Sequence, residues 1–315
     1  MKRRIFIQLL FAASLAPAEA LATIPQLGGA GGKKIVRPSD NSQIMAEEDD
    51  IAADVHAKAD VHAKADASFD TPIDDDNIKD YLSKIRAPNV PHHDDIYASP
   101  QEMQVLRRIA DRFRKIVFLG GDANFCVMSF DDALNAAKNN TKIEPFAKDE
   151  INLMDMLFFR NARDYGFYGE KQSAHIADVI DRRDIYKVPY SGNFLFKGVS
   201  LQKFAEIRKD MGEDLILTSG IRSIVKQFYL FINKALRFDG NLSLASRSLA
   251  PPGYSYHVNG DFDVGQRGFG AENFTENFLD TPIYKSLSRR GYVQYRYGRD
   301  NLLGVRFEPW HVKVT

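Results

Sequence analysis

The stretch APPGYSYHVNGDFDVG, residues 250–265, brings together side chains that can bind a metal ion or move a proton: Ser255, His257, Asp261 and Asp263. Glycines on both sides of these residues allow the backbone to turn tightly. Carboxylates and imidazoles are costly to bury without a partner, and a metal ion is one partner that satisfies them. A histidine in such a segment can also be a hydrogen-bonded core residue. The rest of the chain has to distinguish these two interpretations.

A second stretch, GVRFEPWHVKV at residues 304–314, adds a glutamate and a histidine to an otherwise strand-like apolar run. Glu308 and His311 flank Trp310, the only tryptophan of the chain. His257, an aspartate and His311 would form a set of the kind that binds zinc and leaves one tetrahedral position open. Glu308 is then left over as a base. This division of labour suits hydrolysis, because zinc lowers the pKa of the water that it binds to roughly 7 and a carboxylate can take the proton.

The composition is that of a soluble, folded protein. The chain has 315 residues, 44% hydrophobic and 27% charged, which is enough for one or two domains with a core. Lysine plus arginine equals aspartate plus glutamate at 42 each, so no global charge indicates nucleic acid or an anionic membrane surface as a partner. Cys126, the only cysteine, excludes an intramolecular disulfide and a cysteine-rich zinc cluster. We expect its thiol to be a small buried apolar group.

Residues 1–22, MKRRIFIQLLFAASLAPAEALA, predict an export signal, with basic residues followed by an apolar run and small residues. The apolar run is too short to span a bilayer. Arg3 and Arg4, followed by Phe6, resemble a twin-arginine signal. We therefore expect an exported protein in the periplasm or outside the cell, with the twin-arginine route as one option.

The remaining chain divides into three segments. Residues 23–98 show no sustained periodicity and carry more acids than bases, which predicts a disordered acidic linker. A helical subdomain is expected over 99–170, because a capping box at Ser99 and Glu102 precedes apolar residues at helical spacing. Helices followed by shorter strand-like runs over 171–315 predict an α+β domain, in which helices pack on one side of a small antiparallel sheet.

Three blocks carry a resemblance to a known family: SGIRSIVKQ at 219–227, SYHVNGDFD at 255–263 and EPWH at 308–311. In this order and spacing they resemble the signature blocks of the zinc D-alanyl-D-alanine carboxypeptidases related to VanY. These LAS-type metallopeptidases share a fold with the Hedgehog signalling domain. The resemblance covers residues 171–315 and implies a zinc peptidase that removes a terminal D-alanine from the stem peptides of peptidoglycan.

The resemblance also implies a role for individual residues. It places the metal ligands at His257, Asp263 and His311, and the catalytic glutamate at Glu308. The arginine and serine of the family fall on two further positions, Arg222 and Ser255. A guanidinium at the start of a helix is suited to the terminal carboxylate of a substrate, and stabilisation of the oxyanion is the alternative role. Ser255 and Gln227, which lies about one helical turn after the arginine, could add polar contacts to the stem peptide.

Two departures from the family pattern stand out. Ile221 replaces a tyrosine, so any substrate contact made by that ring is in doubt here. The family's histidine and aspartate are also one position further apart than His257 and Asp263. A one-residue deletion after Gly260 makes Asp263 the ligand, and Asp261 is the alternative, because spacing alone does not show which side chain faces the metal.

Other functions fit parts of the pattern. An endopeptidase of the same fold would use the same site on crosslinked stems, and D,D and L,D specificity are both open. A catalytically silent peptidoglycan-binding module would keep the fold, but it would not need Glu308 as a base beside the metal. A serine hydrolase using Ser255, His257 and Asp263 is disfavoured, because the sequence has no GxSxG nucleophile elbow.

Overall fold

The computed structural model describes residues 78–314, which all lie in one compact unit, Ser39–Thr315. The expected export signal, residues 1–22, and the expected linker over residues 23–77 lie outside the described residues. No helix among the described residues is long and apolar enough to cross a membrane.

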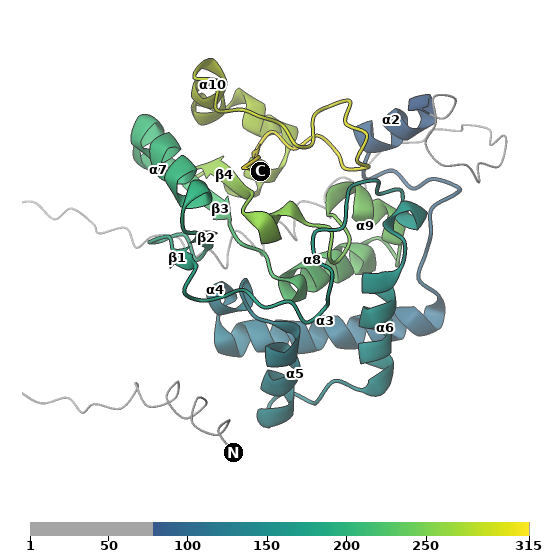
Figure 1. The fold of residues 1–315 in the computed structure, drawn as a ribbon. Helices are drawn as coiled ribbons and strands as arrows, with labels where there is room; N and C mark the ends of the chain where they lie inside the picture. The colour runs from purple at the N-terminus through teal and green to yellow at the C-terminus, as the bar shows by residue number, and fades with distance from the viewer. Residues whose placement is uncertain (1–77, 315) are drawn as a thin grey trace, which may run out of the picture. The chain divides into compact units, whose positions relative to one another are not determined.

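The first part of the described chain is helical, as the sequence predicts (Figure 1). Its elements are α2 (Ile78–Arg86), α3 (Pro100–Gly120), α4 (Asp122–Phe125), α5 (Phe130–Asn139), α6 (Lys148–Phe159) and the 3-10 helix η2 (Ala162–Tyr165). The predicted capping box is confirmed at the start of α3, where the Glu102 amide donates to the Ser99 hydroxyl and the Ser99 amide donates to the Glu102 carboxylate. Together these bonds satisfy backbone donors that a helix start leaves without partners.

Residues 78–98 correct the expected linker, because they are ordered. Tyr81 and Ile85 of α2 are buried, and Asp95 accepts hydrogen bonds from Arg247 and Asn241. The physical reason is local. Tyr81 and Ile85 lie one helical turn apart and give α2 an apolar face to bury. The sequence prediction missed this helix because two residues are too short a pattern to stand out in a stretch, 23–98, that is acidic as a whole.

The second part of the described chain contains the strands. Its elements are β1 (Ile185–Lys187), β2 (Phe194–Phe196), α7 (Val199–Met211), η3 (Gly212–Asp214), β3 (Leu215–Ser219), α8 (Ile224–Arg237), α9 (Leu242–Ser248), η4 (Tyr256–Asn259), β4 (Phe262–Gln266), η5 (Gly270–Phe274), η6 (Glu276–Asp280), α10 (Pro282–Arg289) and β5 (His311–Val312). β1 and β2 form an antiparallel pair, and β3, β4 and β5 form an antiparallel sheet in that order. The predicted α+β class with a small antiparallel sheet is confirmed.

One face of the three-stranded sheet packs against helices. Apolar side chains of β3, β4 and β5 form a core with side chains of α7 and α10; its buried members include Leu215, Leu217, Phe262, Val264, Val312, Phe204, Ile207, Ile283 and Leu287. Because side chains alternate along a strand, the residues between these apolar positions face the other way. That opposite face carries the candidate site.

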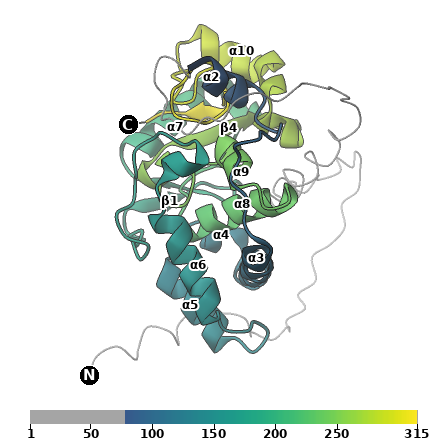
Figure 2. The same ribbon diagram turned by 90° about the vertical axis from the view of Figure 1, so that its right-hand side faces the viewer.

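The helices of residues 99–170 share a second core with α8 and α9. Phe113 of α3 and Phe228 and Phe231 of α8 are fully buried in this core. α3 and α8 are in contact and lie side by side in both views (Figures 1 and 2). Cys126 is buried beside Ile221 in a smaller cluster, in agreement with the apolar role predicted for its thiol.

Candidate metal and catalytic site

The alternation of β4 and β5 places two of the predicted ligands next to each other. Asp263 of β4 and His311 of β5 are direct cross-strand partners. Their neighbours Phe262 and Val312, also partners, point into the sheet core. Antiparallel partners have side chains on the same face, so Asp263 and His311 are held together by the register of the sheet. The Nδ1 atom of His311 lies 3.1 Å from an oxygen of Asp263.

His257 reaches the same point from the short helix η4. Its Nδ1 atom lies 2.8 Å from the carbonyl oxygen of Gly220, and its Nε2 atom lies 3.3 Å from Asp263. The carbonyl can only accept, so Nδ1 carries the proton and the lone pair of Nε2 faces Asp263. The ring centroids of His257 and His311 are 5.0 Å apart.

The predicted ligands fit a zinc ion. One donor atom from each of His257, Asp263 and His311 lies within 4.8 Å of the others, and all three residues are buried. Two imidazole nitrogens and one carboxylate oxygen form a donor set that suits zinc. The geometry favours Asp263 over Asp261 as the third ligand, because the carboxylate of Asp261 is occupied on the far side of His311.

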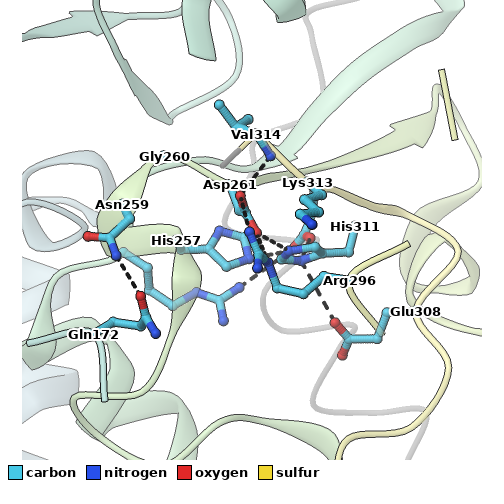
Figure 3. Close-up of polar contacts among 12 residues, drawn as sticks. Gln172, His257, Asn259, Gly260, Asp261, Arg296, Glu308, His311, Lys313 and Val314 are labelled. Atoms are coloured by element: carbon cyan, nitrogen blue, oxygen red, sulfur yellow. Dashed lines mark hydrogen bonds and ion pairs between the residues drawn. The ribbon is translucent and has the colours of Figure 1, made fainter. Parts of the chain in front are cut away.

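Asp261 is fully buried and accepts hydrogen bonds from three directions (Figure 3). The Nε2 atom of His311 lies 2.9 Å from Oδ2, the backbone amide of Val314 donates to Oδ1 at 2.8 Å, and Arg296 donates to both oxygens. Burial alone would raise the pKa of Asp261, but the hydrogen bonds from His311 and Arg296 hold it well below its usual value. Asp261 is therefore a charged acceptor.

The charges of the ligand groups depend on these contacts. Burial lowers the pKa of His257, and the nearby charge of Arg222 lowers it further, so this imidazole is neutral. Burial also opposes a charge on His311, but its hydrogen bonds to Asp261 and Asp263 outweigh burial and raise its pKa to about 9. A metal ion at Nδ1 of His311 would therefore displace a proton.

Glu308 lies beside the ligand group without belonging to it. It is buried, with a carboxylate oxygen 3.9 Å from Nδ1 of His311 (Figure 3), and it lines the same cavity. Burial raises the pKa of Glu308 to about 7, although the positive charges of His311 and Arg306 oppose the shift. A carboxylate with this pKa can both take and return a proton near neutral pH.

Arg222 reaches the site from the turn before α8. Its Nη2 atom lies 3.1 Å from the Ser219 hydroxyl and 3.4 Å from Asp263, and its Nη1 atom lies 3.4 Å from the Gln227 side-chain oxygen. Its Nε atom is buried, and none of the described residues accepts a hydrogen bond from it. An unsatisfied buried donor in a cavity wall is suited to an anionic ligand.

Ser255 and Gln227 differ in their positions. Ser255 lines the cavity, as expected for a substrate contact. Gln227 is almost fully buried, is not among the cavity-lining residues, and donates through its side-chain nitrogen to the carbonyl of Ala250. Its position therefore supports orientation of Arg222 and not direct contact with a stem peptide.

The cavity has a volume of about 530 Å³. Besides the site residues it is lined by Tyr297 and Trp310, and it extends along α8 to residues of α2. The sequence interpretation did not identify Arg296 or Tyr297. Both lie in the irregular segment between α10 and β5, where no periodic pattern or motif indicates which way a side chain points.

The comparison with protein families agrees with this geometry. Residues 198–314 match the family model of VanY, the D-alanyl-D-alanine carboxypeptidases. We refer to the matched residues, 198–314, as the VanY-type domain. All the predicted site residues fall inside it, and the resemblance expected from the three sequence blocks is confirmed. The helices α2 to α6 lie before the VanY-type domain.

Two solved structures are similar to part of the chain. The first is the LdcB LD-carboxypeptidase, described in connection with peptidoglycan recognition, at 24% identity and a TM-score of 0.33, with 41% of this chain and 63% of the LdcB chain covered. The second is a variant of the vancomycin-resistance D,D-pentapeptidase VanY from a VanB-type cassette, in complex with Zn(II). It has 23% identity and a TM-score of 0.32, with 41% of this chain and 77% of the other covered. No curated protein matches the chain.

Proposed function

We propose that the protein is an exported, zinc-dependent carboxypeptidase that removes a terminal D-alanine from peptidoglycan stem peptides. One observation carries the proposal: three buried ligand groups, His257, Asp263 and His311, converge beside a buried glutamate that is not one of them, within a VanY-type domain. A binding module would have no use for the additional carboxylate at Glu308.

Zinc, when held by the three ligands, would supply a Lewis acid that activates water and polarises the scissile carbonyl. Glu308 would take the proton from the attacking water and return it to the departing amine. Burial prepares Glu308 for this task, because a pKa near 7 balances the two transfers. Ser255, in the cavity wall, would donate a hydrogen bond to the substrate backbone.

Arg222 would hold the free carboxylate that distinguishes a chain end from an internal peptide bond. Its guanidinium lies next to Asp263, and its unsatisfied Nε atom adds a donor to the fork. A planar fork can pair with a carboxylate through two hydrogen bonds. This pairing would place the last peptide bond at a fixed distance from the metal ligands.

The test is incubation of the zinc-loaded protein with purified muropeptides, followed by mass spectrometry. We expect loss of a single alanine from pentapeptide or tetrapeptide stems, and the stem that reacts separates D,D from L,D specificity. A chelator should abolish the activity and added zinc should restore it. Cleavage of crosslinked stems alone would identify an endopeptidase, and binding without cleavage would identify a silent module.

Glu308→Gln should bind zinc as tightly as the wild type while losing roughly 10²–10⁴-fold in turnover, because a general base is removed without loss of a ligand. Glu213→Gln is the matched control, since this exposed glutamate does not line the cavity. Metal content, circular dichroism and turnover should be measured on all three proteins. Substantial activity in Glu308→Gln would assign the base to another residue.

A further inference from the structure

We propose that Asp261 and Arg296 act as a pair of positioning residues that fix His311 as a metal ligand and set the metal affinity of the site. Neither residue belongs to the converging ligand group. The proposal rests on the proposed function for the identity of the metal. Arg296 comes from the segment between α10 and β5, and Asp261 is the residue before β4. Asp261 contacts His311 and Arg296 contacts Asp261, so removal of either side chain should weaken zinc binding without removing a ligand.

The first step is the orientation of the His311 ring. Asp261 contacts Nε2 of His311 at 2.9 Å, on the ring edge opposite Nδ1. The Asp261 oxygens also accept from Arg296 and from the Val314 amide, so Nε2 of His311 donates to this carboxylate and keeps its proton. Nδ1 is then the nitrogen whose lone pair a metal ion would use once its own proton is displaced. Outer carboxylates of this kind fix the tautomer of a ligating histidine and increase its basicity.

The second step is the difference between the two histidines. His257 is oriented by the backbone carbonyl of Gly220, which no side-chain substitution removes directly. His311 is oriented by the side chain of Asp261. A charged acceptor strengthens a hydrogen bond about twofold relative to a neutral one. The stronger of the two supports is therefore on His311, which lies on a strand of only two residues.

The third step is the role of Arg296. A fully buried carboxylate needs a compensating charge, and Arg296 supplies it by donating from Nε to one oxygen and from Nη2 to the other at 3.2 Å. The same guanidinium lies 3.7 Å above the ring of Tyr256, the residue before His257. Arg296 thus connects the segment that carries His257 with the support of His311.

A fourth contact extends this support along β5. The Oδ1 atom of Asp261 accepts from the amide of Val314 at 2.8 Å, beyond the two strand pairs that β5 makes with β4. Figure 3 shows Asp261 between Val314, Arg296 and His311. One carboxylate therefore holds both the ligand ring and the backbone after it. Loss of this carboxylate should loosen the ring against Asp263.

The experiment measures zinc affinity by chelator competition and the absorption spectrum of the cobalt(II)-substituted protein. Asp261→Asn keeps the shape of the side chain and Arg296→Gln removes the charge, and each should weaken zinc binding about 10- to 100-fold with a changed cobalt spectrum. The double variant should lose little more than either single variant, because the two side chains act as a unit. Arg296→Lys should recover part of the affinity.

Arg267→Gln is the matched control. This arginine follows β4, is half exposed, donates to the backbone of Glu213 and does not line the cavity, so its loss should leave zinc affinity and the cobalt spectrum unchanged.

Unchanged zinc affinity and spectrum in Asp261→Asn and Arg296→Gln would overturn the proposal, even if activity fell. So would a loss of affinity matched by equal unfolding of the metal-free variants. A wild type that binds zinc tightly but cleaves no stem peptide would overturn the proposed function alone.

Discussion

Arg222 illustrates, at the scale of one residue, how the site could distinguish a chain end. Its side chain is largely buried, contacts Asp263 at 3.4 Å, and is joined to Gln227 at the other edge. A buried cation next to a metal ligand is costly unless an anion compensates it. Asp263 compensates it in part, and the unsatisfied Nε atom leaves a donor for a second anion. The terminal carboxylate of a stem peptide meets this description.

We expect Arg222→Ala to lose most of its preference for a stem with a free terminal carboxylate over the same stem amidated at that end. The wild type should prefer the free acid, because only a carboxylate pairs with the guanidinium through two charged hydrogen bonds. Measurement of kcat/KM on both stems for both proteins checks this. If both rates fell equally and the preference survived, Arg222 would serve the oxyanion, and recognition of the chain end would lie elsewhere.

The sequence identifies those residues of the candidate site whose type a motif specifies. It does not identify the other residues of the site. His257, Glu308 and His311 fall on residue types that the matched blocks specify, and the structure brings them together. The choice between Asp261 and Asp263 required the strand register, because neither spacing nor residue type distinguishes a ligand from its outer support. Arg296 could not have been predicted, since its contact depends on the path of an irregular segment.

At the scale of elements, the turn between β3 and α8 determines two features of the site. The carbonyl of Gly220 orients His257, and Arg222 follows two positions later. The Ser223 side chain accepts from the Lys226 amide and caps α8, while its own amide donates to the carbonyl of Cys126. The sequence predicted the start of a helix here. It could not indicate that a backbone carbonyl would be the partner of a ligand.

Gly220→Ala should both destabilise the protein and weaken zinc binding. A Cβ atom at Gly220 would lie 2.1 Å from the carbonyl oxygen of Phe194, so the turn or β2 has to move, at a cost of roughly 1–3 kcal/mol. The displaced carbonyl would no longer orient His257. Thermal unfolding and chelator competition would measure the two effects. Gly298→Ala, whose Cβ meets nothing closer than 3.8 Å, is the control and should change neither quantity.

At the scale of the whole described molecule, the helices before the VanY-type domain share its core. α3 packs on α8, and Lys226 of α8 forms an ion pair with Asp122 at 2.7 Å. The sequence predicted a helical subdomain, because amphipathic spacing identifies an apolar face. It could not identify the partner of that face, since periodicity is the same whether a helix packs on its own subdomain or on its neighbour. α8 begins directly after Arg222 and Ser223, so the core that holds α8 also holds this edge of the site.

Phe113→Ala tests whether this shared core supports the site. Phe113 is fully buried in the core that α3 shares with α8, so the substitution should cost about 3–5 kcal/mol. Trp310, the only tryptophan, packs in the sheet core and reports on the site by fluorescence, whereas circular dichroism reports mainly on the helices. If the described residues unfold as one cooperative unit, Phe113→Ala should lower the thermal midpoints measured by fluorescence and by circular dichroism equally. Phe204→Ala, in the sheet core, should do the same. A shift in the circular dichroism transition with an unchanged Trp310 transition would show instead that α3 folds independently of the metal site.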